Sequence, residues 1–309
     1  MKSKKCVFGP LKSRRLGLSL GVDLLPFKTC SMDCVYCECG STTDLTMKRT
    51  EFVPVEKVIA ELDAVLATGV KPDFITFSGA GEPTLHSGIG KIVKHIKTAH
   101  PDCKVCLLTN STTLTSPELA QSVADVDLIV PSLDGSNQEE FDKINRPAPG
   151  LSLEAIADAI AKFREISKAQ MWLEIFIVPG INDKQESALR FRELVRRIKP
   201  DKVQLNTLDR PGTEDWVRVP SREAIDLLAK IIAETGVPVE AVGRNLPPAA
   251  AAKRQAPASA SEFNSLIMEM VLRRPCTAED VALTLDVALP IAEAQLGRME
   301  REGMLSSEP

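Results

Sequence analysis

The sequence has no apolar stretch long enough to cross a bilayer and no excess of basic residues. Its basic first residues are not followed by an apolar run, so we expect no secretory signal and a cytoplasmic protein without membrane contact. The formal net charge of −4 gives no general attraction for nucleic acid or an anionic membrane. In the cytoplasm the eight cysteines are expected to stay reduced, so a disulfide framework is not expected.

Histidine is also scarce, with His86, His95 and His100 scattered along the chain. We interpret the last two as surface residues of a helix over 89–98 and of its end.

The 309 residues, 44% of them hydrophobic, alternate predicted strands with predicted helices, which implies parallel strands with right-handed crossovers. Six such units are too few for a closed eight-stranded barrel, and the pattern alone leaves a doubly wound open sheet as an alternative. In either fold the chemistry belongs at the carboxyl ends of the strands. The predicted strands cover 19–24, 73–77, 104–108, 126–130, 172–178 and 202–205, with a short one at 238–242, and the helices cover 55–67, 89–98, 117–123, 153–166, 185–198 and 221–234.

A change of composition predicts a second domain. Residues 246–260 are rich in alanine and proline and form a linker after a main domain over 1–245. Residues 261–309 are predicted as a small all-α domain that resembles a helix-turn-helix or winged-helix module. This domain has nine acidic and four basic residues, so we expect it to contact protein rather than nucleic acid. Its predicted helices cover 262–272, 278–285 and 290–302, and its expected core includes Leu266, Ile267, Met270, Leu283, Leu296 and Met299.

Three cysteines organise the chain. Cys30, Cys34 and Cys37 are spaced C-x3-C-x2-C after a predicted strand. Soft thiolates at this spacing suit zinc or an iron–sulfur cluster. Structural zinc usually takes four ligands, and no second pair lies where a zinc knuckle would need it. Three thiolates on a four-iron cluster leave one iron open to a substrate or cofactor.

This spacing is the signature of the radical S-adenosylmethionine (SAM) superfamily, and the stretch resembles its members. The segments 9–17 and 20–23 resemble the lead-in of a group of predicted Fe–S oxidoreductases related to the wyosine-base-forming tRNA enzymes. The likeness covers about residues 6–240. It implies a partial (β/α)6 barrel, a [4Fe–4S] cluster on the three cysteines, and SAM as the second cofactor.

The resemblance also assigns residues to SAM. The segment 78–84, Ser-Gly-Ala-Gly-Glu-Pro-Thr, is a variant of the superfamily's Gly-Gly-Glu segment, which holds the SAM amino group. Taken alone, its G-x-G suggests a dinucleotide fingerprint, but the third glycine is missing. Polar residues that end later strands are implied to contact the SAM carboxylate and ribose, although turn formation also explains them. The implied SAM residues are Tyr36 near the adenine, Gly79, Gly81 and Glu82, then Thr109, Asn110, Ser132 and Asp134.

Four further residues are candidates on their own chemistry. Glu174 lies within an apolar strand, so if it points into the barrel it needs a basic partner or the cofactor. Asn206 ends the next strand, where it would face the adenine or the substrate. Arg146 and Arg210 follow strands in loops on the active-site side and are candidates for binding an anionic substrate group, with solvated loop arginines as the alternative.

The remaining cysteines give weaker signals. Cys39 is close enough to the motif to be an extra ligand or a radical quencher. Cys103 and Cys106 have metal-like spacing, but they overlap the start of a strand, at the barrel end opposite the motif. We therefore expect Cys106 to pack as a small hydrophobe rather than to hold an auxiliary cluster.

These features predict a radical SAM enzyme. One electron from a flavodoxin- or ferredoxin-like donor would cleave SAM to methionine and a 5′-deoxyadenosyl radical, which takes a hydrogen atom from the substrate. The substrate is not identified by the sequence, and tRNA, a peptide or protein, and a small molecule all stay open. The alternative is a non-catalytic Fe–S binding regulator or assembly factor.

Overall fold

The computed structural model describes residues 5–13, 15–210, 212–243, 260–272 and 275–307. The expected linker at 246–260 lies outside the described residues except for Ala260. The strands are β1 (Val7–Ser13), β2 (Gly17–Val22), β3 (Thr29–Cys30), β4 (Asp44–Leu45), β5 (Phe74–Phe77), β6 (Val105–Thr109), β7 (Leu128–Pro131), β8 (Gln170–Phe176), β9 (Lys202–Asn206) and β10 (Val239–Val242). The helices are α1 (Val55–Leu66), α2 (Ile89–Ala99), α3 (Pro117–Ser122), α4 (Gln138–Asn145), α5 (Leu153–Ile166), α6 (Gln185–Ile198), α7 (Arg222–Ala233), α8 (Ala260–Val271), α9 (Ala278–Leu285) and α10 (Leu289–Arg301), with short 3-10 turns at Pro83–Leu85 and Thr112–Thr115.

The larger part of the chain is an α/β unit built on one eight-stranded sheet, with the order β1-β2-β5-β6-β7-β8-β9-β10. Every pair from β2 onward is parallel, which confirms the expected parallel sheet. Each new strand joins the same edge, whereas the order of a doubly wound sheet reverses at a switch point. The sheet is therefore wound like a barrel, and in the described part of the chain its end strands β1 and β10 do not pair.

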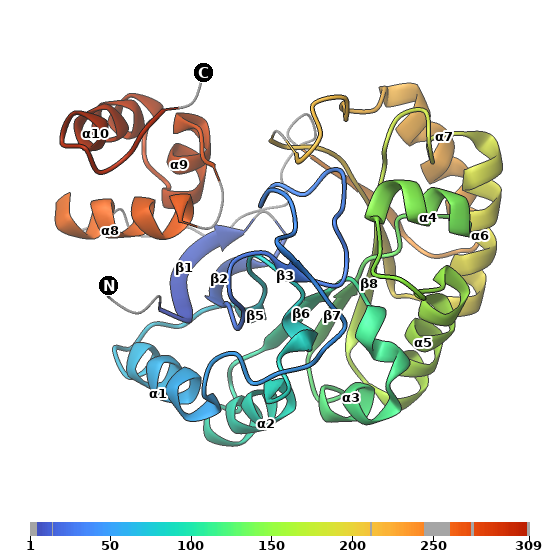
Figure 1. The fold of residues 1–309 in the computed structure, drawn as a ribbon, viewed down its shortest axis with the longest axis horizontal. Coiled ribbons are helices and arrows are strands. Elements are labelled where there is room, and N and C mark those ends of the chain that lie inside the picture. The colour runs from blue at the N-terminus through green and yellow to red at the C-terminus, as the bar shows by residue number, and fades with distance from the viewer. Residues whose placement is uncertain (1–4, 14, 211, 244–259, 273–274, 308–309) are drawn as a thin grey trace.

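The helices α1, α2, α3, α5, α6 and α7 form an arc around the outside of the strands (Figure 1). The main hydrophobic core lies between this arc and the sheet. In β8, Leu173 and Ile175 belong to that core. Because side chains alternate along a strand, Trp172 and Glu174 face the concave side instead. The concave side thus holds a small apolar cluster that includes Trp172 and Cys106, together with polar groups such as Glu174.

The structure differs from the sequence-based expectation at two places near the site. β1 is an extra edge strand that pairs antiparallel with β2, and it precedes the first strand that the sequence predicted. The segment that was expected to be a long loop after β7 contains α4, whose N-cap Asn137 accepts a hydrogen bond from the amide of Glu140. Arg146 caps the other end of α4 with positive φ.

The C-terminal helices α8, α9 and α10 enclose a second, smaller core that includes Ile267, Val281 and Met299. Most of the apolar residues expected in this core are there, but Leu283 is 53% exposed, so its assignment was wrong. Within 260–272 and 275–307 no strand accompanies the helices, and a winged-helix type is therefore not supported.

The C-terminal helices contact the α/β unit along β1 and the cysteine loop. Glu269 of α8 accepts a hydrogen bond from the amide of Gly9, and Lys12 pairs with Asp286. The strongest contact is that of Arg210, whose guanidinium makes two hydrogen bonds to Asp280 at 2.6 and 2.7 Å. The same guanidinium donates to Glu38 at 2.9 Å. Arg210 thus joins α9 to the residue that follows Cys37 in the chain.

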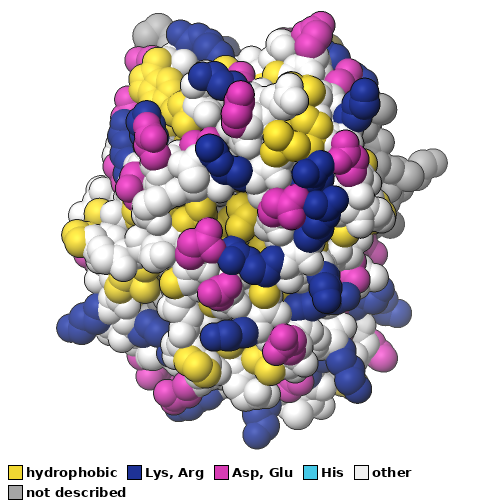
Figure 2. Space-filling view, turned by 90° about the vertical axis from the view of Figure 1, so that its right-hand side faces the viewer, with side chains coloured by type: hydrophobic (Ala, Val, Ile, Leu, Met, Phe, Trp, Pro, Cys, Tyr) yellow, Lys and Arg dark blue, Asp and Glu magenta, His cyan; other side chains and the backbone are white. Residues whose placement is uncertain are grey.

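Figure 2 shows the face formed by α4 to α7, where acidic and basic side chains are interspersed. Pairs such as Arg192–Glu234 and Arg197–Glu154 account for this pattern. This face carries no single-sign patch of the kind that binds nucleic acid. No described helix is long and apolar enough to cross a membrane.

We expect Arg210→Ala to loosen the contact between α9 and the cysteine loop. The substitution removes the guanidinium that pairs with Asp280, whose side chain is 3% exposed, and breaking this buried pair costs about 3 kcal/mol. Hydrogen exchange of the α9 amides should accelerate. The control Arg222→Ala removes an exposed pair with Asp226 and should change stability by less than about 0.5 kcal/mol. Equal exchange in the two variants would contradict the bridging role.

Candidate active site

The cysteine motif lies on the loop between β2 and α1, at the carboxyl ends of the parallel strands. Cys30 is in β3, which pairs with β4 within the same loop. Each motif sulfur has a side-chain N–H donor beside it: Lys28 Nζ lies 3.0 Å from Cys37, Asn145 Nδ2 lies 3.3 Å from Cys34, and Asn110 Nδ2 lies 3.6 Å from Cys30. Such donors stabilise sulfur-bound negative charge.

The three motif thiols differ in acidity. Contact with Cys39, helped by the ammonium of Lys28, lowers the pKa of Cys37 to about 5. Burial raises the pKa of Cys30 to about 12 and holds the pKa of Cys34 well above its ordinary value. Because a thiolate is the form that binds metal, filling the site must release protons from Cys30 and Cys34.

Glu82 ties the ends of β5 and β6 together. Its buried carboxylate accepts hydrogen bonds from the hydroxyl of Thr109 at 2.8 Å and from the amide of Asn110 at 2.6 Å. It also accepts from the amide of Thr84. Burial nevertheless raises its pKa. The carboxylate thus fixes the backbone from which Asn110 reaches Cys30 and, at 2.9 Å, Ser31.

Gly79 and Gly81 pack against the cysteine loop. A Cβ on Gly81 would lie 2.0 Å from the carbonyl oxygen of Thr29, and one on Gly79 would lie 2.3 Å from the carboxylate of Asp23. Thr29 directly precedes Cys30, so close backbone approach within the protein is itself a reason for glycine here. A contact of these glycines with SAM stays a prediction.

Asp134 joins three elements behind Cys34. Its buried carboxylate accepts hydrogen bonds from the Tyr36 hydroxyl at 2.6 Å, from Asn145 Nδ2 at 2.7 Å and from the Phe176 amide at 2.8 Å. The Tyr36 ring stacks on Phe176 with centroids 3.8 Å apart. Burial raises the pKa of Asp134 to about 6. The roles of Tyr36 and Asp134 toward SAM stay predictions, because both side chains have partners within the protein.

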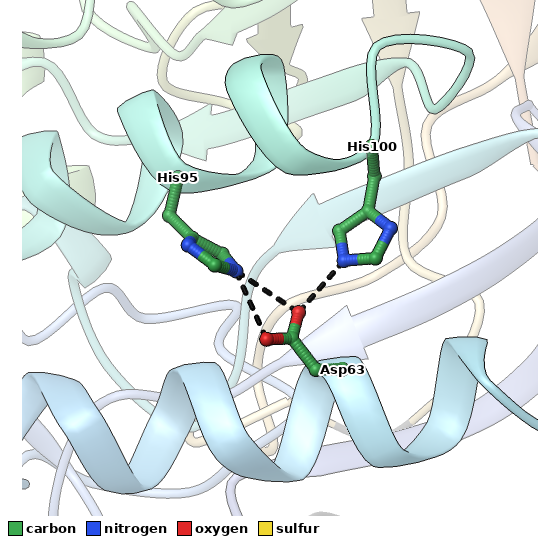
Figure 3. Close-up of side chains that lie close together, drawn as sticks. All are labelled: Asp63, His95 and His100. Carbon is green, nitrogen blue, oxygen red and sulfur yellow. Dashed lines mark hydrogen bonds and ion pairs between the residues drawn. The ribbon is translucent and has the colours of Figure 1, made fainter.

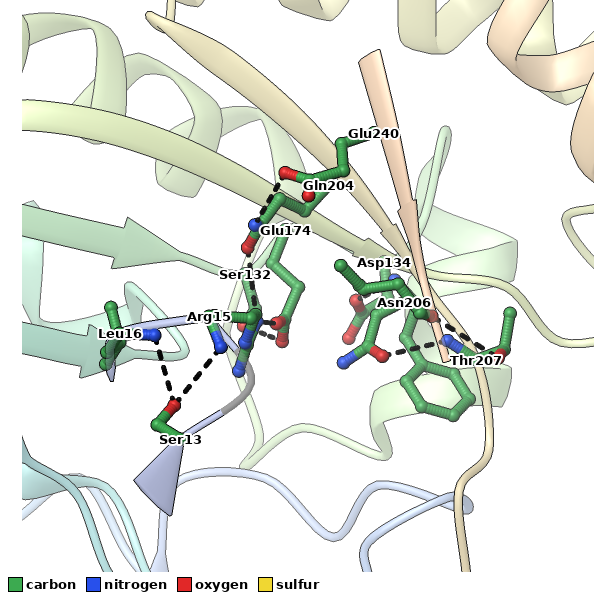
Figure 4. Close-up of polar contacts among 12 residues, drawn as sticks. Ser13, Arg15, Leu16, Ser132, Asp134, Glu174, Gln204, Asn206, Thr207 and Glu240 are labelled. Atoms are coloured by element: carbon green, nitrogen blue, oxygen red, sulfur yellow. Dashed lines mark hydrogen bonds and ion pairs between the residues drawn. The ribbon is translucent and has the colours of Figure 1, made fainter. Parts of the chain in front are cut away.

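Glu174 points to the concave side and has a basic partner, Arg15, which resolves the alternative left open by the sequence. Arg15 lies between β1 and β2 and donates to both Glu174 and Gln204 (Figure 4). The hydroxyl of Ser132 is 3.5 Å from the same carboxylate. Burial lowers the pKa of Arg15, but the charge of Glu174 outweighs this and the pKa is raised.

The other predicted contacts lie at the rim. Asn206 ends β9 near Asp134 in Figure 4, and its Oδ1 accepts from the amide of Thr207. Arg146 pairs with Glu214 and lines an open groove of about 540 Å³ together with Leu45 and Pro147. Arg210 is held by Glu38 and Asp280, so its guanidinium is already bound by two carboxylates. Anion binding by the two arginines stays a prediction.

The other cysteines lie as expected. Cys106 is fully buried in an apolar cluster with Leu16 and Leu128, which confirms that it packs as a hydrophobe. Cys103 precedes the start of β6, at the barrel end opposite the motif. Cys39 lies beside Cys37, and its assignment as an extra ligand or a radical quencher stays a prediction.

Comparison with known proteins decides the family. The profile of the Radical SAM superfamily matches residues 24–192. This chain belongs to the radical SAM superfamily. It is 32% identical over 240 residues to a UPF0026 protein of Methanocaldococcus jannaschii, covering 77% of this chain and 72% of that protein.

Two other similarities are more limited. A Brachyspira hyodysenteriae protein named GTPase Obg is 36% identical over 230 residues, but this radical SAM chain spans only 34% of its length. A radical SAM methyltransferase structure from Sphaerobacter thermophilus superposes with a TM-score of 0.56 at 19% identity, covering 73% of this chain and 66% of that one. The structural likeness concerns the fold alone.

The residues of this radical SAM protein fit the cluster that the family implies. The three thiols form a soft donor set, and each sulfur has a neighbouring N–H donor. Beside Cys34, the buried Oδ1 of Asn145 has no hydrogen-bond partner in the described part of the chain. Such an atom can accept a hydrogen bond from water or from a bound group. Lys28 and Asn145 were not among the predicted site residues.

We expect Cys30→Ala, Cys34→Ala and Cys37→Ala each to abolish the brown absorbance of the reconstituted radical SAM protein, because each removes one of three ligands. Iron analysis checks the same loss. The matched control Cys103→Ala removes a partly buried thiol at the opposite barrel end and should keep its iron. Full iron content in the Cys34 variant would contradict the assignment.

A second prediction concerns the concave side. Arg15→Leu leaves the carboxylate of Glu174 without its cation and should destabilise the protein by about 3 kcal/mol in urea unfolding. The double variant Arg15→Leu/Glu174→Leu removes both charges and should recover most of that loss. Lys143→Ala, which removes an exposed pair with Glu139, serves as the control. A double variant no more stable than Arg15→Leu would refute the pairing.

Proposed function

We propose that this chain is a radical SAM enzyme in which Cys30, Cys34 and Cys37 hold a [4Fe–4S] cluster. The observation that carries the proposal is the set of N–H donors of Lys28, Asn110 and Asn145, one beside each sulfur. With SAM bound, the cluster supplies a 5′-deoxyadenosyl radical that removes a hydrogen atom from a substrate. The electron comes from a flavodoxin- or ferredoxin-like protein.

The chain's own residues have three tasks in this proposal. Lys28 and the two asparagines hold the thiolates and keep their charge stabilised. Glu82 and Asp134 fix the strand ends and the loop around the cluster. The predicted SAM contacts Gly79, Gly81, Thr109, Ser132 and Asn206 line the same carboxyl ends of β5 to β9.

We propose the substrate class from the groove beside Arg146 and from the charge of the C-terminal helices. Arg146 lines an open groove next to β4 of the cysteine loop, and an anionic substrate group would bind there by replacing Glu214 as its partner. A tRNA-base-modifying role, suggested by the likeness to wyosine-forming enzymes, is not favoured by charge, since the C-terminal helices bear an acidic excess. We assign those helices to contact with the α/β unit or with a protein partner instead, and Asp280 and Glu269 already bind the α/β unit.

Reductive cleavage of SAM tests the proposal. Anaerobically reconstituted protein with dithionite and SAM should form 5′-deoxyadenosine, measured by chromatography, whereas Cys34→Ala should give only background. Cys103→Ala should form product like the wild type. A fully loaded cluster that forms no 5′-deoxyadenosine would instead favour a non-catalytic Fe–S regulator or assembly factor.

A further inference from the structure

A second group of metal-binding side chains lies far from the cysteine loop. Asp63 of α1 is brought beside two histidines that the sequence suggested were isolated surface residues, His95 of α2 and His100 at its end. The Nε2 atoms of His95 and His100 lie 2.9 and 2.7 Å from the same oxygen, Asp63 Oδ1 (Figure 3). The three side chains converge on one point from two helices.

The chemistry and spacing of these atoms suit a single ion. All three ligand atoms lie within 4.8 Å of one another, and among the described residues this is the one group of three or more His, Cys, Asp or Glu side chains that meets this condition. Tetrahedral zinc with bonds of 2.0–2.1 Å needs ligand atoms about 3.3 Å apart. The two N···O distances of 2.9 and 2.7 Å therefore need to lengthen by about half an ångström.

The surroundings allow the coordination to be completed. The side chains of His95 and His100 are each 25% exposed and that of Asp63 is 42% exposed, so water can supply a fourth ligand. Two histidines and one carboxylate with an open position form an established zinc ligand set. The nearby ammonium of Lys97 is paired with Asp127 at 2.8 Å. Because hydrogen bonds already hold both rings toward Asp63, little ordering is needed on binding.

We propose that Asp63, His95 and His100 bind Zn²⁺ and that the ion links α1 to α2. His100 precedes β6, so the site lies at the amino ends of the strands, opposite the cluster loop. On binding, the two Nε2–H···O hydrogen bonds are replaced by Zn–N bonds, and the two protons move to Nδ1 of each ring as the other neutral tautomer forms. The site is separate from the radical chemistry and acts on stability.

Zinc binding to the full chain with its cluster reconstituted tests this proposal. Equilibrium dialysis against Zn²⁺ followed by metal analysis should give one zinc per chain beyond the iron. His95→Gln, His100→Gln and Asp63→Asn should each weaken the affinity for zinc by at least about 100-fold. Zinc at about 100 times the wild-type Kd should raise the melting temperature of the wild type by about 5 °C and that of the variants by no more than about 1 °C.

Matched controls separate this site from the thiols. Glu56→Gln and Lys94→Gln change exposed residues of the same two helices and should bind zinc like the wild type. In a Cys30→Ser/Cys34→Ser/Cys37→Ser background the zinc should remain and should still depend on His95. Zinc that is absent from the wild type, or that persists unchanged in His95→Gln, would overturn the proposal and leave a hydrogen-bonded cluster only.

Discussion

The arrangement around the cysteine motif depends on the buried carboxylate of Asp134. Its three donors come from the cysteine loop, the end of α4 and the end of β8, which are segments that no local interaction would bring together. Moving a charge from water into the protein interior costs several kcal/mol. The carboxylate of Asp134 is therefore tolerated only while all three donors are in place. The position of Asn145 beside Cys34 therefore depends on the pairing of β7, which Asp134 follows, with β8, which Phe176 ends.

This arrangement has a pH dependence whose sign follows from the direction of the shift. Burial raises the pKa of Asp134 from 3.8 to about 6. The stability gained from the protonated form is complete below about pH 4 and is lost as the pH rises through 6. At neutral pH the group is ionised, and the Tyr36 hydroxyl, whose pKa burial raises, stays protonated and able to donate. The three hydrogen-bond donors then offset the desolvation cost of the ionised Asp134 carboxylate, to which the surrounding apolar side chains cannot donate.

The sequence predicted those parts of the molecule whose signals are local. The cysteine spacing lies within eight residues, and the barrel helices have continuous apolar faces, so both were recognised. α4 was missed because it is short and polar, although Asn137 and the apolar pair Phe141 and Ile144 were an available signal. Asn145, Arg15 and the His95–Asp63 contact could not be found in this way. Their partners are 111, 159 and 32 residues away, and only the fold brings them together.

The C-terminal helices are part of the same set of constraints. Arg210 is bound at once by Asp280, which also caps α9, and by Glu38 in the cysteine loop. Burial lowers its pKa, but the hydrogen bonds of Asp280 and the charge of Glu38 outweigh this, so the guanidinium stays charged. Only 10% of the Arg210 side chain is exposed, so moving its guanidinium away from either carboxylate would break a largely buried ion pair. Breaking such a pair lowers the stability of the protein. The position of α9 and the position of the loop that follows Cys37 are therefore not independent.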